Sequence, residues 1–406
     1  MKCGAGTLLN SFARMQNFVK SGFDMKILIY TNCLEGHNLE YIHHIYVRAS
    51  KENDKFFLFL IPEEFKKKKI MMEWPEANNI FFDFISQEQT EKCNRNKYFH
   101  FLGTQTYSAR LLARKIKQHE PDHVFMDIDQ GIPYLDLFLG CNQKTRISCI
   151  CYRIIPYEWK TLPLIKKIIE WLTYHVILKR SRYQTVFLLN NRKYLDLYNN
   201  KFHTDKYRYL TDPVTTDVNL GKNLREEFNI PPSSKVFIHL GVMGRHKGTL
   251  NILDAIRMLS DDESKDLYFI FAGKIGDEMK DEFYEKYNAL KSYRNILVYD
   301  KFCKYEFFSS LYKTCDYVLF PYTPRPNSSG LLGNAALYGK PVITTDGGAM
   351  GDIVREYHLG YLMPNNSSFS IYNAIREPYI ANFCPSQYVM DHTINNFCNQ
   401  IFEIFK

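Results

Sequence analysis

Short apolar runs alternate with amphipathic stretches from residue 26 to about residue 375. Between the apolar runs of the first half, apolar residues recur at helical spacing, which predicts helices that include 38–50, 106–118 and 163–180. Strands that alternate with helices in this way indicate a parallel sheet covered by helices. The strands predicted in this half are 26–31, 56–61, 79–83, 123–127, 146–151, 185–189 and 207–210.

The second half repeats the same alternation. Residues 213–233 separate the halves, and Pro231-Pro232-Ser233-Ser234 marks the boundary. We therefore predict an α/β fold with two Rossmann-like, doubly wound domains joined near residue 215. The predicted strands are 235–240, 267–272, 296–299, 317–320 and 341–344, and the predicted helices are 248–259, 277–290, 304–314, 329–338 and 351–357.

The two ends of the chain fall outside this alternation. Met25 runs directly into a strand pattern, so residues 1–24 are predicted to be a leader outside the fold. Residues 386–405 carry apolar side chains at near-helical spacing and no strand pattern. The predicted organisation is a first domain over 25–215, a second domain over 216–377, and a helix over 378–406 that packs back on the first domain.

Charge and cysteine usage narrow the classes of function. The chain has 52 Lys and Arg against 44 Asp and Glu, a net charge of +8. This mild excess suits an anionic ligand or membrane surface and is too small to indicate nucleic acid. No two of the ten cysteines form a CxxC pair, and no apolar run reaches about 18 residues. We expect free thiols, no transmembrane helix and a cytoplasmic location.

Open α/β sheets bind ligands beyond the carboxyl ends of their strands, so the loops after the strands hold the candidate site residues. In the first loop, Gly36 permits a tight turn and His37 precedes a helix. His37 is a candidate for acceptor binding or catalysis, and a helix-capping loop is the alternative. Arg153 follows the strand 146–151 and can bind a phosphate or carboxylate, or lie on the surface.

Asp127 and Asp129 follow another strand of the first half in D-x-D spacing. Two such carboxylates can hold Mn²⁺ or Mg²⁺ on a nucleoside diphosphate. They can instead contact acceptor hydroxyls or cap the helix that follows Gly131. The spacing alone leaves the three roles open.

The strongest signal is the segment 241–248, which follows a strand and opens a helix. Arg245 and Lys247 are two cations beside Gly244 and a helix N-terminus, an arrangement that binds a diphosphate. The same cations would stabilise a leaving nucleoside diphosphate as its charge develops. The spacing is not that of a P-loop, and a solvated basic turn is the alternative.

Two more strand exits in the second half are rich in glycine and small polar residues. Hydroxyl groups and bare backbone N–H groups at such exits can cradle a phosphate or a sugar. Together with 241–248, the exits at 327–334 and 346–352 indicate a ligand site rather than turns alone. The candidates at the first of these two are Asn327, Ser328, Ser329, Gly330, Leu331 and Asn334.

Residues 163–183 form a basic amphipathic pattern. Such a helix can lie in an anionic membrane interface, and a core helix with a solvated basic edge is the alternative. The apolar stripe consists of Ile165, Ile168, Ile169, Leu172, Val176 and Ile177, and the basic flank of Lys166, Lys167, Lys179, Arg180 and Arg182.

Residues 235–362 resemble GT-B glycosyltransferases, particularly the large family 4 (group 1) of retaining enzymes. The first domain resembles them only in its α/β pattern, and the last helix resembles their crossover helix. The motifs that carry the resemblance are Lys247-Gly248, Ala272-Gly273, Asp316 before 317–321, the run from Gly339 to Ile343, and Gly347-Gly348 followed by Asp352-Ile353-Val354.

The resemblance implies donor binding in the second domain, including Gly273, with Lys247 and less closely Arg245 on the donor diphosphate. The family carries a pair of glutamates where this sequence has Pro326 and Asn334. Asn334 can still hydrogen-bond a ribose hydroxyl, and the serines at 328 and 329 can hold the phosphate or sugar. The missing pair leaves the donor sugar and the retaining stereochemistry open.

We therefore predict a hexosyltransferase-type enzyme that moves sugar from a nucleoside-diphosphate sugar to a glycan or lipid-linked acceptor in surface polysaccharide biosynthesis. The resemblance implies this setting, with the enzyme in the cytoplasm or on the inner face of the membrane. We expect no metal cofactor, because the cations would neutralise the diphosphate, and no nucleic-acid partner. The alternatives are a metal-dependent transferase built on Asp127 and Asp129, and a non-catalytic nucleotide-sugar-binding GT-B protein.

Overall fold

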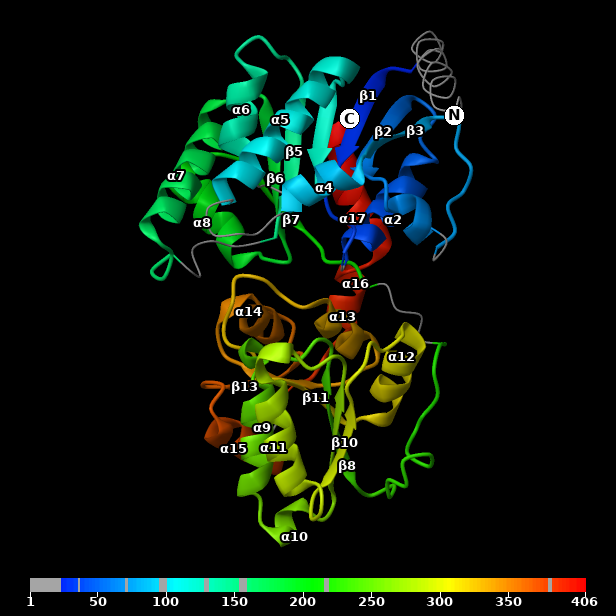
Figure 1. The fold of residues 1–406 in the computed structure, drawn as a ribbon, viewed down its shortest axis with the longest axis vertical. Helices are drawn as coiled ribbons and strands as arrows, with labels where there is room; N and C mark the ends of the chain where they lie inside the picture. Colours follow the sequence, from blue (N-terminus) through cyan, green and yellow to red (C-terminus); the bar gives the residue numbers. More distant parts are fainter. Residues whose placement is uncertain are drawn as a thin grey trace.

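The computed structural model describes residues 23–35, 37–69, 72–94, 101–127, 131–152, 159–214, 219–378 and 382–406. The chain forms two lobes stacked along the long axis of the molecule, each built on one parallel sheet covered by helices (Figure 1). Two doubly wound sheets are the fold class that the sequence predicts.

The first sheet has seven parallel strands in the order β3-β2-β1-β4-β5-β6-β7. The order reverses between β1 and β4, so the loops after these strands diverge and open a crevice at their carboxyl ends. The strands are β1 (Met25–Tyr30), β2 (Lys55–Pro62), β3 (Ile80–Ile85), β4 (His123–Met126), β5 (Arg146–Cys151), β6 (Tyr183–Leu189) and β7 (Tyr207–Leu210).

Helices cover both faces of this sheet, and its central strands are correspondingly apolar on both sides. In β2, every residue from Phe56 to Pro62 is buried, as expected for a strand that is covered twice. The helices are α2 (Asn38–Ala49), α3 (Phe65–Lys68), α4 (Gln87–Asn94), α5 (Phe101–His119), α6 (Ile132–Leu139), α7 (Leu164–Lys179) and α8 (Lys193–Phe202).

The second sheet has six strands in the order β10-β9-β8-β11-β12-β13, which reverses between β8 and β11. Its strands are β8 (Lys235–Leu240), β9 (Leu267–Ala272), β10 (Asn295–Tyr299), β11 (Tyr317–Phe320), β12 (Val342–Thr345) and β13 (Gly360–Met363). Its helices are η3 (Arg245–Lys247), α9 (Thr249–Met258), α10 (Asp261–Ser264), η4 (Asp277–Met279), α11 (Lys280–Leu290), α12 (Tyr305–Thr314), α13 (Gly330–Leu337), α14 (Gly348–Glu356) and α15 (Ser368–Arg376).

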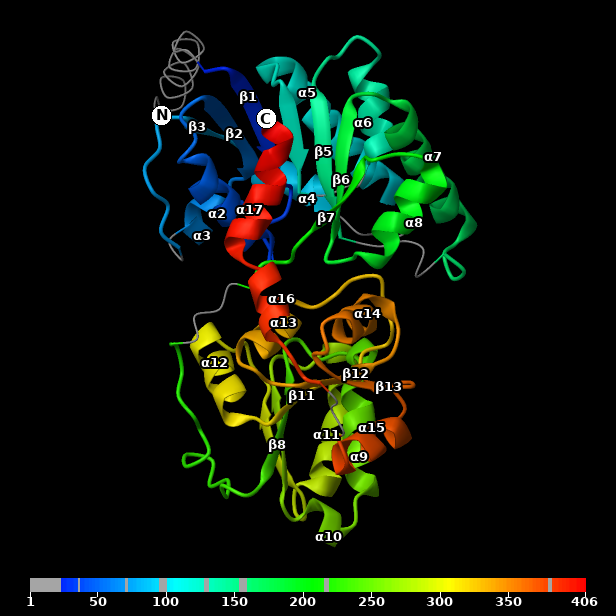
Figure 2. The same cartoon turned by 180° about the vertical axis from the view of Figure 1, so that it is seen from behind.

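The chain then crosses back to the first lobe through α16 (Ser386–Asp391), α17 (Ile394–Phe402) and η5 (Glu403–Phe405), as Figure 2 shows from behind. Phe397 and Phe405 are fully buried in the core of the first sheet. The sequence predicts one helix over 386–405, but the structure breaks it at His392. Thr393 caps the second helix, because its side chain accepts a hydrogen bond from the Asn396 backbone N–H at 3.1 Å.

The sequence pattern misses several short elements. The strand β13 has only four residues and begins at Gly360, and the pattern predicts no helix where α15 lies. Residues 1–22 lie outside the described part of the chain. Phe23, which the sequence places in the leader, packs against the first core, and the Asp24 N–H donates to the Asp54 carbonyl at 2.8 Å. None of the helices in the described ranges is long and apolar enough to span a bilayer.

Candidate active site

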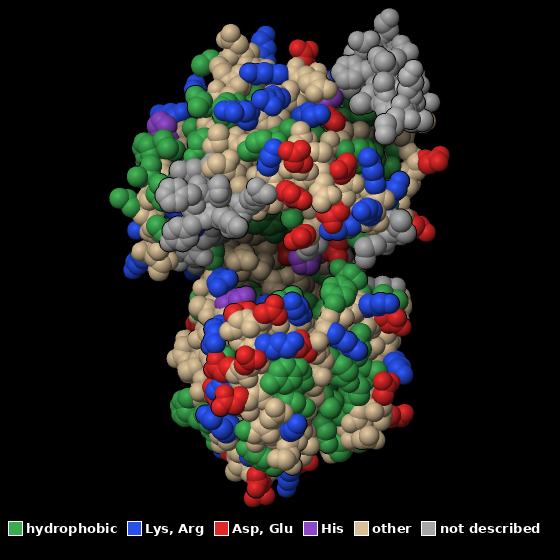
Figure 3. Space-filling view, in the orientation of Figure 1, with side chains coloured by type: hydrophobic (Ala, Val, Ile, Leu, Met, Phe, Trp, Pro, Cys, Tyr) green, Lys and Arg blue, Asp and Glu red, His purple; other side chains and the backbone are tan. Residues whose placement is uncertain are grey.

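The carboxyl ends of both sheets face the waist between the lobes, where the surface is hollowed (Figure 3). On the second-domain side, the exits of β8 and β9 touch each other. A Cβ atom at Gly273 would lie 2.0 Å from the Gly241 carbonyl oxygen, and Gly273 has φ +138°. The structure therefore gives Gly273 a packing role, which brings the two strand exits together.

Lys247 lies beside this junction. Its ammonium would be 3.2 Å from a Cβ atom built on Gly241, and it lies 5.3 Å from the centre of the Tyr322 ring. Burial lowers its pKa from 10.5 to about 8, and no carboxylate of the described ranges is among the causes of this shift. A partly desolvated ammonium without a carboxylate is a site for an anionic ligand.

Arg245 does not join Lys247, which corrects the expectation of a two-residue cation pair. Its guanidinium donates to the Glu282 carboxylate at 2.7 Å, with the Arg245 side chain 57% exposed. The short 3₁₀ turn of η3 separates the two side chains, because a tight turn points successive residues in different directions.

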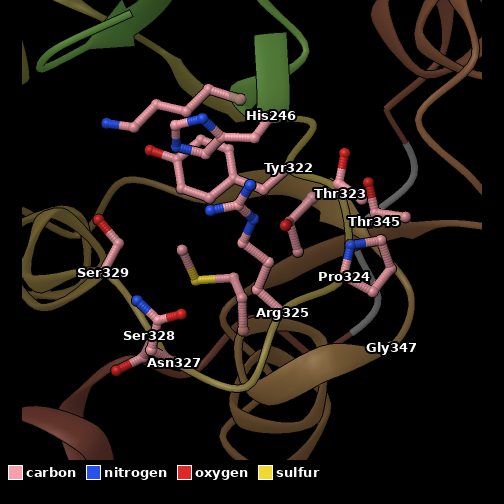
Figure 4. A pocket seen from close by; sticks show the side chains of 13 residues that line it. His246, Tyr322, Thr323, Pro324, Arg325, Asn327, Ser328, Ser329, Thr345 and Gly347 are labelled. Atoms are coloured by element: carbon pink, nitrogen blue, oxygen red, sulfur yellow. The ribbon is translucent and has the colours of Figure 1, made fainter. Parts of the chain in front are cut away.

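A different cation takes the expected place. Arg325, in the loop between β11 and α13, projects into the same pocket as Lys247 and His246 (Figure 4). Backbone hydrogen bonds tie this loop to its neighbours, from Thr323 N–H to the His246 carbonyl and from Ala349 N–H to the Arg325 carbonyl, both at 2.9 Å. Burial, Arg325 and Lys247 all lower the pKa of His246.

The pocket at these loops has no acidic residue among its described lining residues. It encloses about 120 Å³, less than the roughly 300–1,000 Å³ of a complete small-molecule site. A ligand of ordinary small-molecule size that binds here would therefore extend beyond the pocket into the cleft. Its other lining residues are Tyr322, Thr323, Pro324, Asn327, Ser328, Ser329, Thr344, Thr345, Gly347 and Met350.

Three of the sequence candidates at the β11 exit, Asn327, Ser328 and Ser329, line this pocket. The other three lie in α13. Gly330 and Leu331 open the helix, and the Leu331 side chain reaches Gly241, since it would lie 3.1 Å from a Cβ atom there. Asn334 lies one turn further on and is half-buried. Pro326, at the position of the missing first glutamate, is buried.

His37 reaches this helix from the first domain. A Cβ atom at Gly330 would lie 2.5 Å from His37 Nε2 and Cε1, so the imidazole rests on the first residue of α13. His37 Nδ1 lies 3.2 Å from Glu40 Oε2, and this hydrogen bond raises the His37 pKa. The Tyr305 hydroxyl of the second domain donates to the same Glu40 carboxylate. The two domains therefore meet at the loop that the sequence singles out.

Asp127 has a different environment from the one expected. It is 1% exposed, and the Tyr152 hydroxyl donates to its Oδ1. Burial raises its pKa to about 7. Buried beneath the β4 exit, it neither faces an acceptor nor caps α6 with its side chain, since Gly131 is the N-cap of that helix. Gly36, Asp129 and Arg153 lie outside the described residues.

Asp127 belongs to a buried cluster at the floor of the first-domain cleft. The Tyr41 hydroxyl donates to Asp212, and the rings of Tyr41 and Tyr152 stack at 6.3 Å with an interplanar angle of 5°. Burial also raises the Asp212 pKa. In the described ranges no three His, Cys, Asp or Glu side chains gather as metal ligands would.

Sequence reasoning missed His246, Tyr322 and Arg325. Arg325 comes directly before Pro326, the position at which the resembled family has a glutamate. The comparison with that family therefore pointed to the neighbouring residue. Glu40 and Tyr305 were also missed, because they meet across 265 residues of sequence and no local pattern reports such a contact.

Comparison with known proteins agrees with this geometry. Residues 222–379 match the family model described as glycosyl transferases group 1. The match spans nearly all of the second domain. The Lys247 and Arg325 pocket lies within the matched range. A search of curated proteins by sequence found no match.

Solved structures with the same two-domain GT-B fold cover nearly the whole chain. HepE from Anabaena, described in complex with UDP and glucose, has TM-score 0.63 at 15% identity and covers 94% of this chain and 99% of its own. A UDP-forming α,α-trehalose-phosphate synthase from Burkholderia xenovorans has TM-score 0.67 at 9% identity, covering 93% and 99%. Sucrose-phosphate synthase from Thermosynechococcus elongatus has TM-score 0.66 at 10% identity, covering 94% and 98%. The predicted GT-B architecture is confirmed.

The buried Asp127 predicts a specific pH dependence of stability. Its pKa is about 7 in the folded protein against 3.8 for the ordinary group, so the folded state holds a proton that the unfolded chain releases. Stability therefore falls as pH rises from about 4 to about 7, by at most about 1.4 kcal/mol per pH unit. Asp127→Asn keeps an acceptor for Tyr152 but cannot ionise, so it should gain stability relative to wild type between pH 4.5 and 7.5.

Urea unfolding of both proteins at the two pH values measures this difference. If the free energy of unfolding of the Asp127→Asn variant differs from that of wild type by the same amount at both pH values, Asp127 does not titrate in this range.

Proposed function

We propose that this protein is a glycosyltransferase that transfers a sugar from a UDP-sugar to an acceptor held by the first domain. The observation that carries the proposal is the cationic pocket of the second domain, where Lys247 and Arg325 lie without a lining carboxylate. The descriptions of two neighbouring proteins, HepE and the trehalose-phosphate synthase, name UDP, UDP-glucose or a UDP-forming reaction, which supports uracil as the base.

In this proposal the diphosphate of the donor binds between Lys247, Arg325 and the N-terminus of α13. No side chain caps that terminus, and although the Leu332 N–H donates to the Ser329 carbonyl, the N–H groups of Gly330 and Leu331 are available to phosphate oxygens. As the bond to the sugar breaks, negative charge grows on UDP, and these donors stabilise it. The lowered Lys247 pKa still leaves most of the ammonium charged at pH 7, and a bound diphosphate would raise it again.

The acceptor enters from the first-domain side, where His37 projects toward Gly330. In this proposal His37 contacts the acceptor or the transferred sugar. We propose a glycan or lipid-linked acceptor and a role in surface polysaccharide biosynthesis at the cytoplasmic side of a membrane. We also propose that the reaction retains the anomeric configuration of the donor sugar, which the group 1 match supports. Determining the anomeric configuration of the product would test this.

Two variants of neighbouring cations test the donor site. Lys247→Ala should weaken UDP binding by about 1.5–3 kcal/mol, or about 10- to 150-fold, because it removes charged hydrogen bonds from a partly desolvated site. Arg245→Ala is the matched control, since Arg245 pairs with Glu282 on the surface and should change affinity by less than about twofold. Titration calorimetry with UDP, and with GDP and ADP for comparison, measures both.

Equal affinities of the two variants would remove Lys247 from the donor site. UDP binding without sugar transfer across a panel of UDP-sugars would instead favour the non-catalytic binding protein.

The second test concerns metal. If side chains neutralise the diphosphate, EDTA should leave sugar transfer largely intact, and Asp127→Asn should leave UDP affinity unchanged because Asp127 is buried away from the pocket. Transfer assays with EDTA, with and without added Mn²⁺, measure this. Loss of activity that Mn²⁺ restores would favour the metal-dependent transferase.

We also propose that α7 contacts an anionic membrane. Ile165, Ile168 and Leu172 are 57%, 50% and 39% exposed, which a core helix would not leave in water. Part of the predicted stripe faces inward, since Ile177 is buried. Arg180 and Arg182 pair with Asp136, so the charge attraction relies on Lys167 and Lys179.

If α7 contacts the membrane, the protein should sediment with phosphatidylglycerol vesicles in a salt-dependent way and should sediment little with phosphatidylcholine vesicles. The reason is that each lysine near an anionic surface contributes about 1 kcal/mol of binding free energy. Ile168→Gln should reduce vesicle binding about tenfold through lost apolar burial. Leu137→Gln, on α6 and 74% exposed, should leave it unchanged. Equal, negligible binding of wild type to both vesicles would remove the membrane from the proposal.

A further inference from the structure

A large cavity lies between α7 and α8, outside the donor pocket. It measures about 710 Å³, within the range of about 300–1,000 Å³ typical of small-molecule sites. None of its described lining residues belongs to the Lys247 and Arg325 pocket. Its described lining residues are Trp159, Lys160, Trp171, Tyr174, His175, Leu178, Leu197, Tyr198, Lys201 and Phe202.

Aromatic rings form most of the wall. Tyr174 and Tyr198 share a hydrogen bond of 2.9 Å between their hydroxyl groups, so these two polar atoms are already paired. The Tyr174 ring also stacks on Phe202 at 5.8 Å, and the Trp171 ring stacks on His175 at 5.3 Å. The paired hydroxyls and packed rings leave a rigid and mainly apolar surface.

The charged groups on the lining are both cationic. Lys160 and Lys201 are exposed lining residues, and no Asp, Glu, Asn or Gln occurs among the described lining residues. Glu170 on α7 is close enough to Tyr198 to raise its pKa, but it does not line the cavity. The combination suits an apolar body with an anionic head.

The surroundings of the cavity extend its apolar surface. Trp171 belongs both to the lining and to the outer face of α7, where it is 59% exposed. Ile168 and Leu164 lie one and two turns before it on the same face and are 50% and 74% exposed. Hydrophobic side chains gather over α7 at the left edge of the upper lobe in Figure 3.

A glycan would require a different lining. Sugars present many hydroxyl groups, and each one that is buried needs a hydrogen-bond partner. The described lining offers two lysines, one histidine, two tryptophan indole N–H groups and two tyrosines that bond to each other, and it has no amide or carboxylate side chain. A hydrocarbon chain needs none of these partners and gains about 0.8 kcal/mol for each methylene group that it buries.

We propose that the α7–α8 cavity binds an acyl chain of an anionic membrane phospholipid, with Lys160 and Lys201 at the lipid phosphate. This inference deepens the proposed membrane contact, on which it rests, by naming the lipid and the cavity that receives it. The first domain would then hold one lipid chain in its interior while the outer face of α7 lies on the bilayer.

Two leucine variants with the same charge change test the cavity. Leu197→Asp places a carboxylate on the lining at a residue that is 49% exposed, and Leu137→Asp places one at an exposed position outside it. The probe is decyl phosphate, used as monomers below its micellar concentration, in titration calorimetry with wild-type protein. We expect one bound molecule, at least about tenfold weaker binding to Leu197→Asp, and less than about twofold change for Leu137→Asp.

The lipid class is tested with further probes. Lys201→Gln should weaken the binding of decyl phosphate. It should not weaken the binding of decyl maltoside, which has the same chain and a neutral head. Vesicles of phosphatidylglycerol with brominated acyl chains should quench Trp159 in a background that carries Trp74→Phe and Trp171→Phe, and Leu197→Asp should abolish this quenching of Trp159. A prenyl phosphate that displaces the brominated lipid at equimolar amounts would assign the cavity to a lipid carrier and overturn the phospholipid proposal.

Two other results would also overturn the phospholipid proposal. One is equal binding of decyl phosphate to both aspartate variants, and the other is binding of maltotriose that Leu197→Asp abolishes. Failure of this inference is separable from failure of the donor site, because UDP binding should persist in Leu197→Asp and decyl phosphate binding should persist in Lys247→Ala.

Discussion

The relative position of the two sheets depends on a joint where the chain crosses between the domains twice. The Val214 N–H donates to the His392 carbonyl at 2.9 Å, which ties the outgoing segment to the returning one. The His392 ring stacks on Tyr388 at 3.8 Å and lies 2.8 Å from Asn190 Oδ1. Because His392 is fully buried, and burial lowers its pKa to about 4, the His392 ring is neutral near pH 7.

This joint makes the carboxyl ends of both sheets face the same cleft. Each sheet alone has a crevice where its strand order reverses, and the return of α17 to the first core holds the two crevices opposite each other. Contacts on two sides of the cleft follow from this position: Tyr305 with Glu40 on one, and Lys193 with Asp352 at 3.0 Å on the other. The exposed pair contributes little energy by itself, so the buried joint carries the alignment.

The sequence predicted the sheets well because buried parallel strands leave apolar runs, such as 56–61 and 235–240, that recur between amphipathic stretches. It predicted Lys247 because glycines and a helix start surround it. It could not predict that Arg245 turns to Glu282 or that Arg325 enters the pocket, since side-chain direction in a loop depends on neighbours far away in sequence. The same holds for Asp127: its D-x-D spacing suits a ligand site, while burial against Tyr152, which only the fold reveals, removes it from the cleft.

Binding of an anionic donor requires a charged Lys247, whereas folding favours the uncharged form of this buried side chain. Burial lowers its pKa to about 8, which means that the folded protein holds the charged form less favourably than water does. Below that pH the ammonium therefore costs folding free energy, and none of the carboxylates in the described ranges offsets it. The neighbouring Arg245, which keeps both solvent and Glu282, has no such cost. An anion that binds beside Lys247 would offset this cost in folding free energy. The unfavourable position of Lys247 is therefore the physical argument for a negatively charged ligand at the β8 exit.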